Sequence, residues 1–486
     1  MSSSLLLDQQ LADNIQGAVP GLPREAIMDT VPRSSLVATK KIVNLVPISS
    51  NSVTSSQTLQ FLIPQRNLAK AHSFYLKFKL RMTNLGDSKK FSFSGTMQSA
   101  AALINSMSVQ AGGTVIESVQ NYHVWHNNVL AWTQRRDQLA LEAPCAGTAN
   151  PARYFTDARF TATANTASVS SVAGGSPFNL KAAAENFVGS STASGGVFED
   201  WFSIPLGMGF FNSKESQFMP LFQFNGGVLL TIQTNPVTKA FFAVGADAAT
   251  ITDYIMSDFE LCYTEIQPSP EYINTVRSGL QSGKLIRIEA QSYLNYNIAC
   301  GENVRQTLNV NCQSLSATFW GRIQNNDAVN TSKFFVKQAN IRDGSGDTAN
   351  IRYEIYYDNQ LLFQSANQLN YDTIVLRQLQ EALTSSITDH AISPFVNGLG
   401  VTAAGGAALS TDPAGCLASQ AWLYGLSNKL FASNSTAMDG TPVGTIQIQF
   451  STPGETTGGA VGLWYFYMVY DYMYLVDANG SVSKIM

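Results

Sequence analysis

The most apolar run of the chain is GLWYFYMVYDYMYLV, residues 462–476. A helix that spans a membrane needs about 20 consecutive apolar residues. Here Asp471 interrupts the run and Asp477 follows it. Aromatic and β-branched side chains suit a pleated sheet, and alternate residues of a strand face opposite sides. One side would carry Trp464, Phe466, Met468, Tyr470 and Tyr472, and the other Tyr465, Tyr467 and Val469. The run therefore predicts a central strand that is covered on both faces, in which the Asp471 carboxylate needs a polar partner.

The length and composition of the chain indicate two domains with a neutral surface. A chain of 486 residues exceeds the size at which one hydrophobic core usually divides. Hydrophobic residues make up 45% of it and charged residues 13%, which is about half the usual charged share. The 30 basic and 34 acidic residues give a net charge of −4. This balance argues against a nucleic-acid-binding protein, because such proteins carry a clustered positive field.

Neither the cysteines nor the first residues indicate export. Five cysteines lie far apart without a C-x-x-C pair, and an odd number of widely spaced thiols is typical of free, buried cysteines in a reducing compartment. A disulfide between Cys300 and Cys312 is the less favoured alternative. The start, MSSSLLLDQQLADNIQ, has neither a basic region nor a long apolar core before Asp8, so we do not expect a secretory signal.

Strand patterns dominate the rest of the chain. FYLKFKLRM (74–82) and TIQIQF (445–450) alternate apolar and polar residues, as strands do when they cover a core on one face only. The expected inward residues are Phe74, Leu76, Phe78, Leu80 and Met82 in the first stretch and Ile446, Ile448 and Phe450 in the second. Lys77, Lys79 and Arg81 then face outward as a basic stripe.

Helical signals are few and short. Leu7, Leu11 and Ile15 predict an amphipathic N-terminal helix. In the stretch 269–283, Ser269 is a candidate N-cap, Pro270 occupies the first helical position and Gly283 ends the helix. A third helix is expected from Asp372, with Leu376, Leu379 and Leu383 on one face.

Three features recur in the same order in both halves of the chain, which indicates two similar β-domains in tandem. QTLQF begins at residue 57 and QTLNV at residue 306, an offset of 306 − 57 = 249. Predicted hairpins turn at Gly112-Gly113 and Asp358-Asn359, an offset of 359 − 113 = 246. Each half ends on an aromatic strand with one aspartate, Asp258 or Asp471, an offset of 471 − 258 = 213. The shrinking offset places a longer insertion in the first half, at residues 143–198, which are rich in Ala, Ser, Thr and Gly.

No catalytic, cofactor-binding or metal-binding residue is assigned. His123 and His126 are three residues apart, but their acidic neighbours Glu117 and Asp137 lack a persuasive spacing, so structural histidines are favoured over a metal site. GLQSGK (279–284) is too short for a phosphate loop and is interpreted as a helix C-cap. The basic stripe is interpreted as a solvated strand face rather than a nucleic-acid surface, because no aromatic platform interleaves with it in the sequence. An enzyme is therefore disfavoured.

The order of these patterns resembles a known family. The segment FSIPLGMGFFNSKESQFMPLFQFNGGVLLTIQTN (202–235), in which IPL and MPL bracket a polar turn before a strand, resembles the double jelly-roll major capsid proteins of icosahedral double-stranded DNA viruses. The Polinton-like viruses, virophages and algal viruses are the most similar. AALINSMSVQAGGTVIESVQNY (101–122) is similar to the hairpin of their first roll. The resemblance spans nearly the whole chain but contains no diagnostic functional residue.

The resemblance implies an all-β fold with two tandem eight-stranded jelly rolls, short helices and long loop insertions. Residues 1–40 would be the N-terminal helix and arm, 41–268 the first roll with its insertion around 143–198, 269–284 a helical linker, and 285–486 the second roll. The implied function is that of a major capsid protein. Three copies would form a pseudo-hexameric capsomer, and such capsomers would tile the icosahedral shell of a DNA virus.

The implied partners are other copies of the chain, as a homotrimer and between capsomers, together with penton and minor capsid proteins. We expect no enzyme activity, no cofactor, no sequence-specific nucleic-acid binding and no transmembrane segment. The expected location is the virion shell, after synthesis in the cytoplasm or nucleus of the host cell and without secretion. The alternative is a β-sandwich adhesin, fibre or carbohydrate-binding protein, which would share the neutral composition. A carbohydrate-active enzyme is less favoured, because it would need converging carboxylates.

Overall fold

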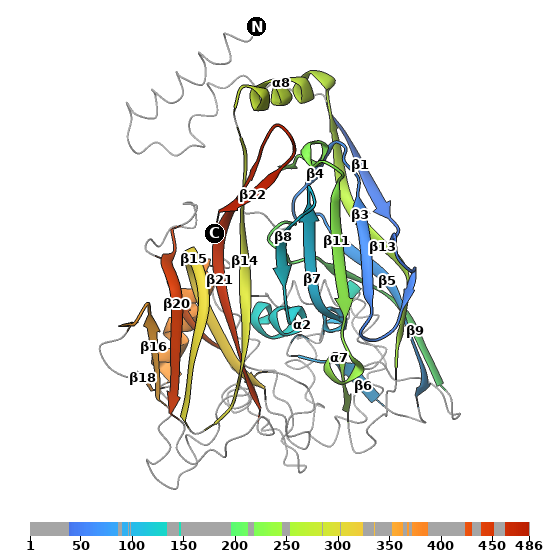
Figure 1. Ribbon diagram of the computed structural model, residues 1–486. Helices are drawn as coiled ribbons and strands as arrows, with labels where there is room; N and C mark the ends of the chain where they lie inside the picture. Colours follow the sequence, from blue (N-terminus) through green and yellow to red (C-terminus); the bar gives the residue numbers. More distant parts are fainter. Residues whose placement is uncertain are drawn as a thin grey trace, which may run out of the picture.

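The fold consists of two β-rolls placed side by side and joined by one helix (Figure 1). The structure is a computed structural model that describes residues 38–85, 90–133 (apart from 96 and 98), 145–146, 196–211, 218–244, 253–301 (apart from 284), 303–323, 335, 352–362, 367–368, 372–386, 423–429, 439–451 and 462–485. The predicted N-terminal helix and nearly all of the predicted insertion at 143–198 lie outside these residues.

The first roll contains a large sheet, a smaller sheet and one isolated strand pair. The large sheet has the order β10-β4-β13-β5-β9, with β1 and β2 also paired to β13, and the smaller sheet has the order β3-β11-β7-β8, while β12 pairs with β6. The strands are β1 Ala38–Leu45, β2 Ser52–Val53, β3 Thr58–Ile63, β4 Leu68–Lys70, β5 Tyr75–Leu85, β6 Lys90–Phe93, β7 Ile104–Ala111, β8 Thr114–Val119, β9 Gly196–Pro205, β10 Phe218–Met219, β11 Val228–Thr234, β12 Phe241–Val244 and β13 Ile255–Pro268. The short helices are η2 Ala100–Leu103, α2 Tyr122–Val124, η3 Trp125–Val129, η4 Leu130–Trp132, η6 Leu221–Gln223 and α7 Val237–Ala240.

The linker between the rolls is helix α8, Pro270–Gln281, which stands at one end of the molecule (Figure 1). The side chain of Ser269 accepts a hydrogen bond from the backbone N–H of Tyr272, as an N-cap does. At the other end Gly283 has a φ of 88° and its N–H donates to the carbonyl oxygen of Leu280. The sequence predictions of an N-cap at Ser269 and a glycine stop are therefore confirmed.

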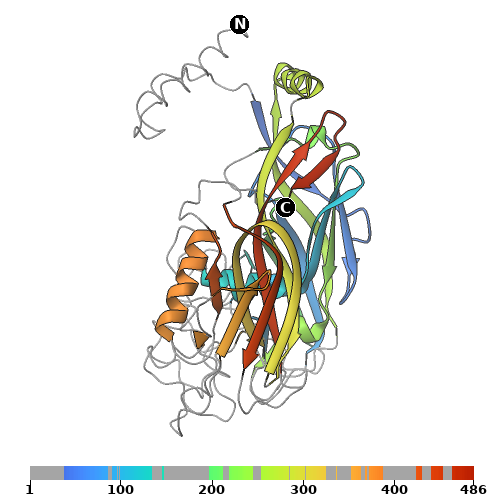
Figure 2. The ribbon, with the colours of Figure 1, turned by 60° about the vertical axis from the view of Figure 1, so that its left-hand side comes forward.

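The second roll is built on one nine-stranded sheet of order β14-β21-β15-β20-β16-β17, to which β18, β19 and β22 add by pairing with β16, β15 and β21. Its strands are β14 Ile286–Ala299, β15 Asn303–Ile323, β16 Arg352–Tyr357, β17 Gln360–Leu361, β18 Asn367–Gln368, β19 Tyr424–Ser427, β20 Thr441–Ser451, β21 Leu463–Val476 and β22 Val482–Ile485. Helix α9, Asp372–Ser386, lies outside this sheet (Figure 2) and buries Leu379 and Leu383, as its spacing predicted. Leu376 falls among the side chains that the structure does not describe.

Strand β21 is the predicted central strand. It pairs with β14 along one edge and with β15 along the other. Trp464 is only 1% exposed and stacks on Phe450, with ring centroids 4.8 Å apart. Asp471 is 2% exposed, and its carboxylate accepts hydrogen bonds from the hydroxyl groups of Ser314 and Ser316. A buried charge of this kind is tolerated because hydrogen bonds replace its lost hydration.

The alternating strands bury the residues that the sequence predicted. The inward residues of β5 and β20 are all at most 3% exposed, and they are Phe74, which precedes β5, with Leu76, Phe78, Leu80, Met82, Ile446, Ile448 and Phe450. Three of the cysteines, Cys262, Cys300 and Cys312, are free and buried as expected. Cys145 is free but exposed, contrary to the expectation, and Cys416 lies outside the described residues.

The two rolls share a common strand arrangement. Strand β1 pairs antiparallel with β13 as β14 pairs with β21, and the hairpin β7-β8 corresponds to the hairpin β16-β17. The turn residues Gly112, Gly113, Asp358 and Asn359 all have positive φ, so both predicted hairpins are confirmed. The aspartates do not correspond. Asp258 sits exposed in a β-bulge with a φ of 52°, whereas Asp471 is buried in a regular strand.

Candidate functional site: the junction between the two rolls

The two histidines considered for a metal site are buried in the first roll. His123 in α2 and His126 in η3 are 6% and 5% exposed, and burial lowers the pKa of His123 to about 3 and that of His126 to about 4. Both rings are therefore neutral at neutral pH. In the described part of the chain, His, Cys, Asp and Glu side chains form no group of three that could hold a metal ion.

The outward basic stripe of β5 is paired within the first roll. The Lys77 amino group lies 3.2 Å from the Glu260 carboxylate, and Lys79 forms an ion pair with Glu199. In the sequence, no aromatic platform interleaves with these cations. In the structure Trp201 of the neighbouring strand β9 lies beneath them, with the Lys77 amino group 4.9 Å from its ring centroid. The carboxylates of Glu260 and Glu199 and the aromatic face of Trp201 therefore contact these cations within the first roll.

The most elaborate polar arrangement lies where the two rolls meet. The first roll contributes β8, α2 and the segment after β9, and the second roll contributes β14, β21 and the hairpin of β21 and β22 (Figure 1). One continuous set of buried apolar residues runs through both rolls. The junction is therefore part of the core and not a contact between two separately finished domains.

The Glu117 carboxylate is the polar centre of the junction. It belongs to β8 and is 2% exposed. It accepts hydrogen bonds from the backbone N–H groups of Gly209 and Phe210, at 3.0 Å and 2.8 Å. From the second roll, Ser292 Oγ donates to it at 2.6 Å and the Tyr472 hydroxyl at 3.2 Å. Charge-assisted hydrogen bonds are the strongest of their kind, so this carboxylate ties both rolls to one point.

Tyrosines and one lysine of the second roll complete this polar centre. The Tyr474 hydroxyl lies 2.9 Å from that of Tyr472 and 3.3 Å from the carbonyl oxygen of Ile116. Burial raises the pKa of both tyrosines well above the usual value, so both hydroxyls keep their protons. The Lys484 amino group lies 4.4 Å from the centre of the Tyr472 ring. Burial lowers the pKa of Lys484, while the charge of Glu117 acts in the opposite direction.

A second set of contacts is aromatic. The ring of Trp125, from the first roll, stacks on Tyr293 at 4.5 Å and lies 5.3 Å from the Tyr467 ring. The side-chain amide of Asn121 donates to Asn295 at 2.6 Å, and the Tyr467 hydroxyl donates to the carbonyl oxygen of Asn121 at 3.1 Å. Together these contacts bury three large rings and fix the orientation of η3 against β14 and β21.

Two glycines allow the rolls to approach closely. A Cβ atom on Gly209 would lie 2.2 Å from the carbonyl oxygen of Gln291, and one on Gly480 would lie 2.3 Å from the carbonyl oxygen of Gln223. Both distances are shorter than any side chain tolerates. The Gln223 amide in turn donates to the carbonyl oxygens of Asp477 and Ala478, at 2.9 Å and 3.0 Å.

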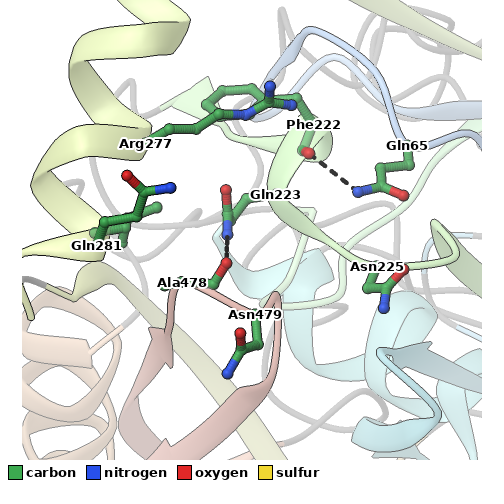
Figure 3. A pocket seen from close by; sticks show the side chains of 9 residues that line it. Gln65, Phe222, Gln223, Asn225, Arg277, Gln281, Ala478 and Asn479 are labelled. Atoms are coloured by element: carbon green, nitrogen blue, oxygen red, sulfur yellow. Dashed lines mark hydrogen bonds between the residues drawn. The ribbon is translucent and has the colours of Figure 1, made fainter.

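Above this contact lies a small polar cavity of about 180 Å³, between α8, η6 and the hairpin tip. Figure 3 shows the Gln223 amide directed at Ala478, and Arg277 of α8 extended over Phe222. A site for a small organic ligand needs a mostly apolar lining, and here apolar side chains supply little of it. We therefore interpret the cavity as the space left where three elements meet.

The chemistry of the junction is that of a structural joint. The Glu117 carboxylate and the hydroxyl groups of Ser292, Tyr472 and Tyr474 are buried and hydrogen-bonded within the junction. Sequence reasoning considered Glu117 only as an acid near two histidines. Its role as a joint between the rolls depends on Ser292 and Tyr472, which lie 175 and 355 residues away in the sequence. No sequence motif links residues at such separations. The one local signal was a carboxylate within the apolar strand TVIESV, which β8 places toward the second roll.

Comparisons with known proteins identify the fold. No protein-family model matches the chain, and no curated protein sequence matches it. Among solved structures, a quasi-atomic model of the PBCV-1 virus capsid superposes with a TM-score of 0.56 at 11% identity, over 94% of this chain and 98% of that one. The structure of the Sputnik virophage at 3.5 Å resolution superposes with a TM-score of 0.52 at 12% identity, over 96% and 93%. The chain therefore has the double jelly-roll fold of these capsid proteins, as the sequence predicted. None of the helices in the described part of the chain has the length and apolar character that a membrane crossing requires.

Proposed function

We propose that this chain is the major capsid protein of an icosahedral double-stranded DNA virus and that it assembles as a trimer with six similar lobes. The observation that carries the proposal is the junction. Two rolls of the same design are locked at one angle by a buried carboxylate, stacked rings and two close glycine contacts. A building block of a shell needs a fixed shape, and such a joint supplies it.

Symmetry supports the same role. Two similar rolls in each chain and a threefold axis give six nearly equivalent lobes, so a trimer can occupy a six-coordinated position of a closed lattice. The likeness to the PBCV-1 and Sputnik structures extends over nearly the whole chain, which agrees with a shared architecture. We propose that the arm ends at residue 40, the first roll at residue 268 and the helical linker at residue 284, with the insertion of the first roll around 143–198. Strand β1 of the first roll already starts at Ala38.

The proposal includes the setting of the protein. The chain would be part of the virion shell, would be made inside the host cell, and would contact penton and minor capsid proteins. It would have no catalytic activity and no cofactor.

Electron microscopy of the purified recombinant chain tests this proposal. The expected particles have a threefold axis, a six-lobed outline and a mass near 3 × 52.6 ≈ 158 kDa. Monomers or elongated fibres would refute it, and a glycan-binding screen would then examine the adhesin alternative.

A further inference from the structure

An ion pair whose two side chains are fully buried lies at one edge of β15 in the second roll. Strands β19 and β20 pair with successive stretches of this edge, so the chain leaves it after Ser427 and returns to it at Thr441. Lys429 and Gly440 form an isolated bridge where the two ends of this excursion meet. The Lys429 amino group lies 3.4 Å from the Asp439 carboxylate, and the side chains are 1% and 0% exposed. The pair therefore closes the neck of the excursion.

The surroundings of this pair do not solvate its carboxylate. In the part of the chain that the structure describes, neither oxygen of the Asp439 carboxylate accepts a hydrogen bond. The Asp471 carboxylate is also buried, but it accepts hydrogen bonds from the hydroxyl groups of Ser314 and Ser316. The attraction within a buried ion pair repays the lost hydration only when further hydrogen bonds satisfy both charges. A reaction that removes the charge of Asp439 would therefore stabilise the fold.

We propose that Lys429 and Asp439 condense to form an isopeptide bond within the chain. The ammonium group first gives one proton to the carboxylate, which leaves a neutral amine beside a neutral carboxylic acid. The amine nitrogen then attacks the carboxyl carbon and forms the new C–N bond. The C–OH bond breaks, and the hydroxyl group leaves as water with a second proton from the nitrogen. The products are one neutral amide and one water molecule, so atoms and charges balance without another reactant.

Position and burial both favour this reaction. The carboxyl carbon is bonded to the oxygen that lies 3.4 Å from the Lys429 nitrogen. The backbone beside the pair is fixed, because Asn428 donates to the carbonyl oxygen of Ser316 and accepts from the N–H group of Thr441. Reacting groups that are held in this way behave as if they were present at very high concentration. The reaction also replaces two buried charges by one amide, which costs much less free energy to bury.

A second ion pair of the same chain lacks these features and serves as the matched control. The Lys77 amino group lies 3.2 Å from the Glu260 carboxylate, but their side chains are 38% and 31% exposed. Water solvates both of these charges, so the amine keeps its proton and is not a nucleophile. We expect no condensation at this pair, although its two groups are closer than those of the buried pair.

The backbone nitrogen of Gly440 is a competing nucleophile for the Asp439 carboxyl group. In an Asp-Gly sequence this nitrogen attacks the preceding side chain, which closes a five-membered ring and also releases water. Here the Gly440 N–H donates to Ser314 Oγ at 2.9 Å. A Cβ atom on Gly440 would lie 2.4 Å from the carbonyl oxygen of Leu315, so the backbone is pressed against β15. The Lys429 amine is therefore the better placed of the two nucleophiles.

Mass spectrometry of the purified full chain tests the proposal. We expect most parent molecules to weigh less than their sequence by one water molecule. Lys429→Met, which keeps the length of the side chain but removes the amine, and Asp439→Ala should both have the full mass of their sequences. After digestion with chymotrypsin, the parent should yield a branched peptide in which Lys429 is joined to Asp439. Lys77 and Glu260 should occur in separate linear peptides.

The outcomes decide the proposal whether or not the variants fold, because the branched peptide is sought in the parent chain. A parent with its full sequence mass and an unmodified Lys429 overturns the proposal. A water loss that persists in Lys429→Met assigns the loss to ring closure by Gly440 and overturns it as well. The inference does not depend on the proposed function, which electron microscopy tests separately.

Discussion

Replacing Glu117 by alanine removes the acceptor of four hydrogen bonds at the centre of the junction. The hydroxyl groups of Ser292 and Tyr472 can rotate toward other acceptors, but the N–H groups of Gly209 and Phe210 are fixed by the backbone. Each buried donor that loses its acceptor costs about 1–3 kcal/mol. The loss of the carboxylate itself, which these four donors had stabilised, adds to this cost. We therefore expect Glu117→Ala to lower the free energy of unfolding by about 3–5 kcal/mol. Glu117→Gln should cost about 1–3 kcal/mol, because one of the two N–H groups then faces an amide NH₂ group.

Urea unfolding, followed by tryptophan fluorescence and far-ultraviolet circular dichroism at one protein concentration, measures this effect. The matched control is Glu260→Ala, which removes a carboxylate from a half-exposed ion pair with Lys77 and should change the free energy by less than about 1 kcal/mol. Because the junction couples the rolls, the alanine variant should also separate one transition into two. A Glu117→Ala protein with the midpoint and the single transition of the parent would refute the assignment of Glu117 as the joint.

Three further predictions concern the core, the histidines and the glycine contact. Trp464→Ala should lower the free energy of unfolding by about 3–5 kcal/mol in urea titrations, whereas Trp201→Ala, at a site 40% exposed, should lower it much less. His123 and His126 have pKa values lowered by burial to about 3 and about 4, so the unfolded chain binds more protons as pH falls below 6.5. The free energy of unfolding should therefore decrease between pH 6 and pH 4, by up to about 1.4 kcal/mol per pH unit for each histidine. A His126→Gln variant whose free energy of unfolding decreases as steeply as that of the parent would contradict this. Gly209→Ala should lower the free energy of unfolding as Glu117→Ala does, because the new Cβ atom would lie 2.2 Å from a carbonyl oxygen of β14. An unchanged urea midpoint would show that the rolls can move apart at this point without loss of stability.

The strands and turns were predictable from the sequence because their signals are local. Alternation in β5 and β20 requires only neighbours two residues apart, and the hairpin turn at Asp358 and Asn359 is marked by residues that tolerate positive φ. The order of these signals in the two halves of the chain also indicated the tandem rolls. Strand β21 was identifiable because apolar residues on both of its faces exclude an edge position.

The junction was not predictable, because its partners are remote in the sequence. Glu117 and Tyr472 are 355 residues apart, and no spacing rule joins them. The aspartate match failed for a related reason. Asp258 and Asp471 stand at similar places in the pattern, yet only the fold reveals that one lies in a bulge at the surface and the other within a sheet. Trp201 was missed beside Lys77 because β9 reaches β5 only through the sheet register.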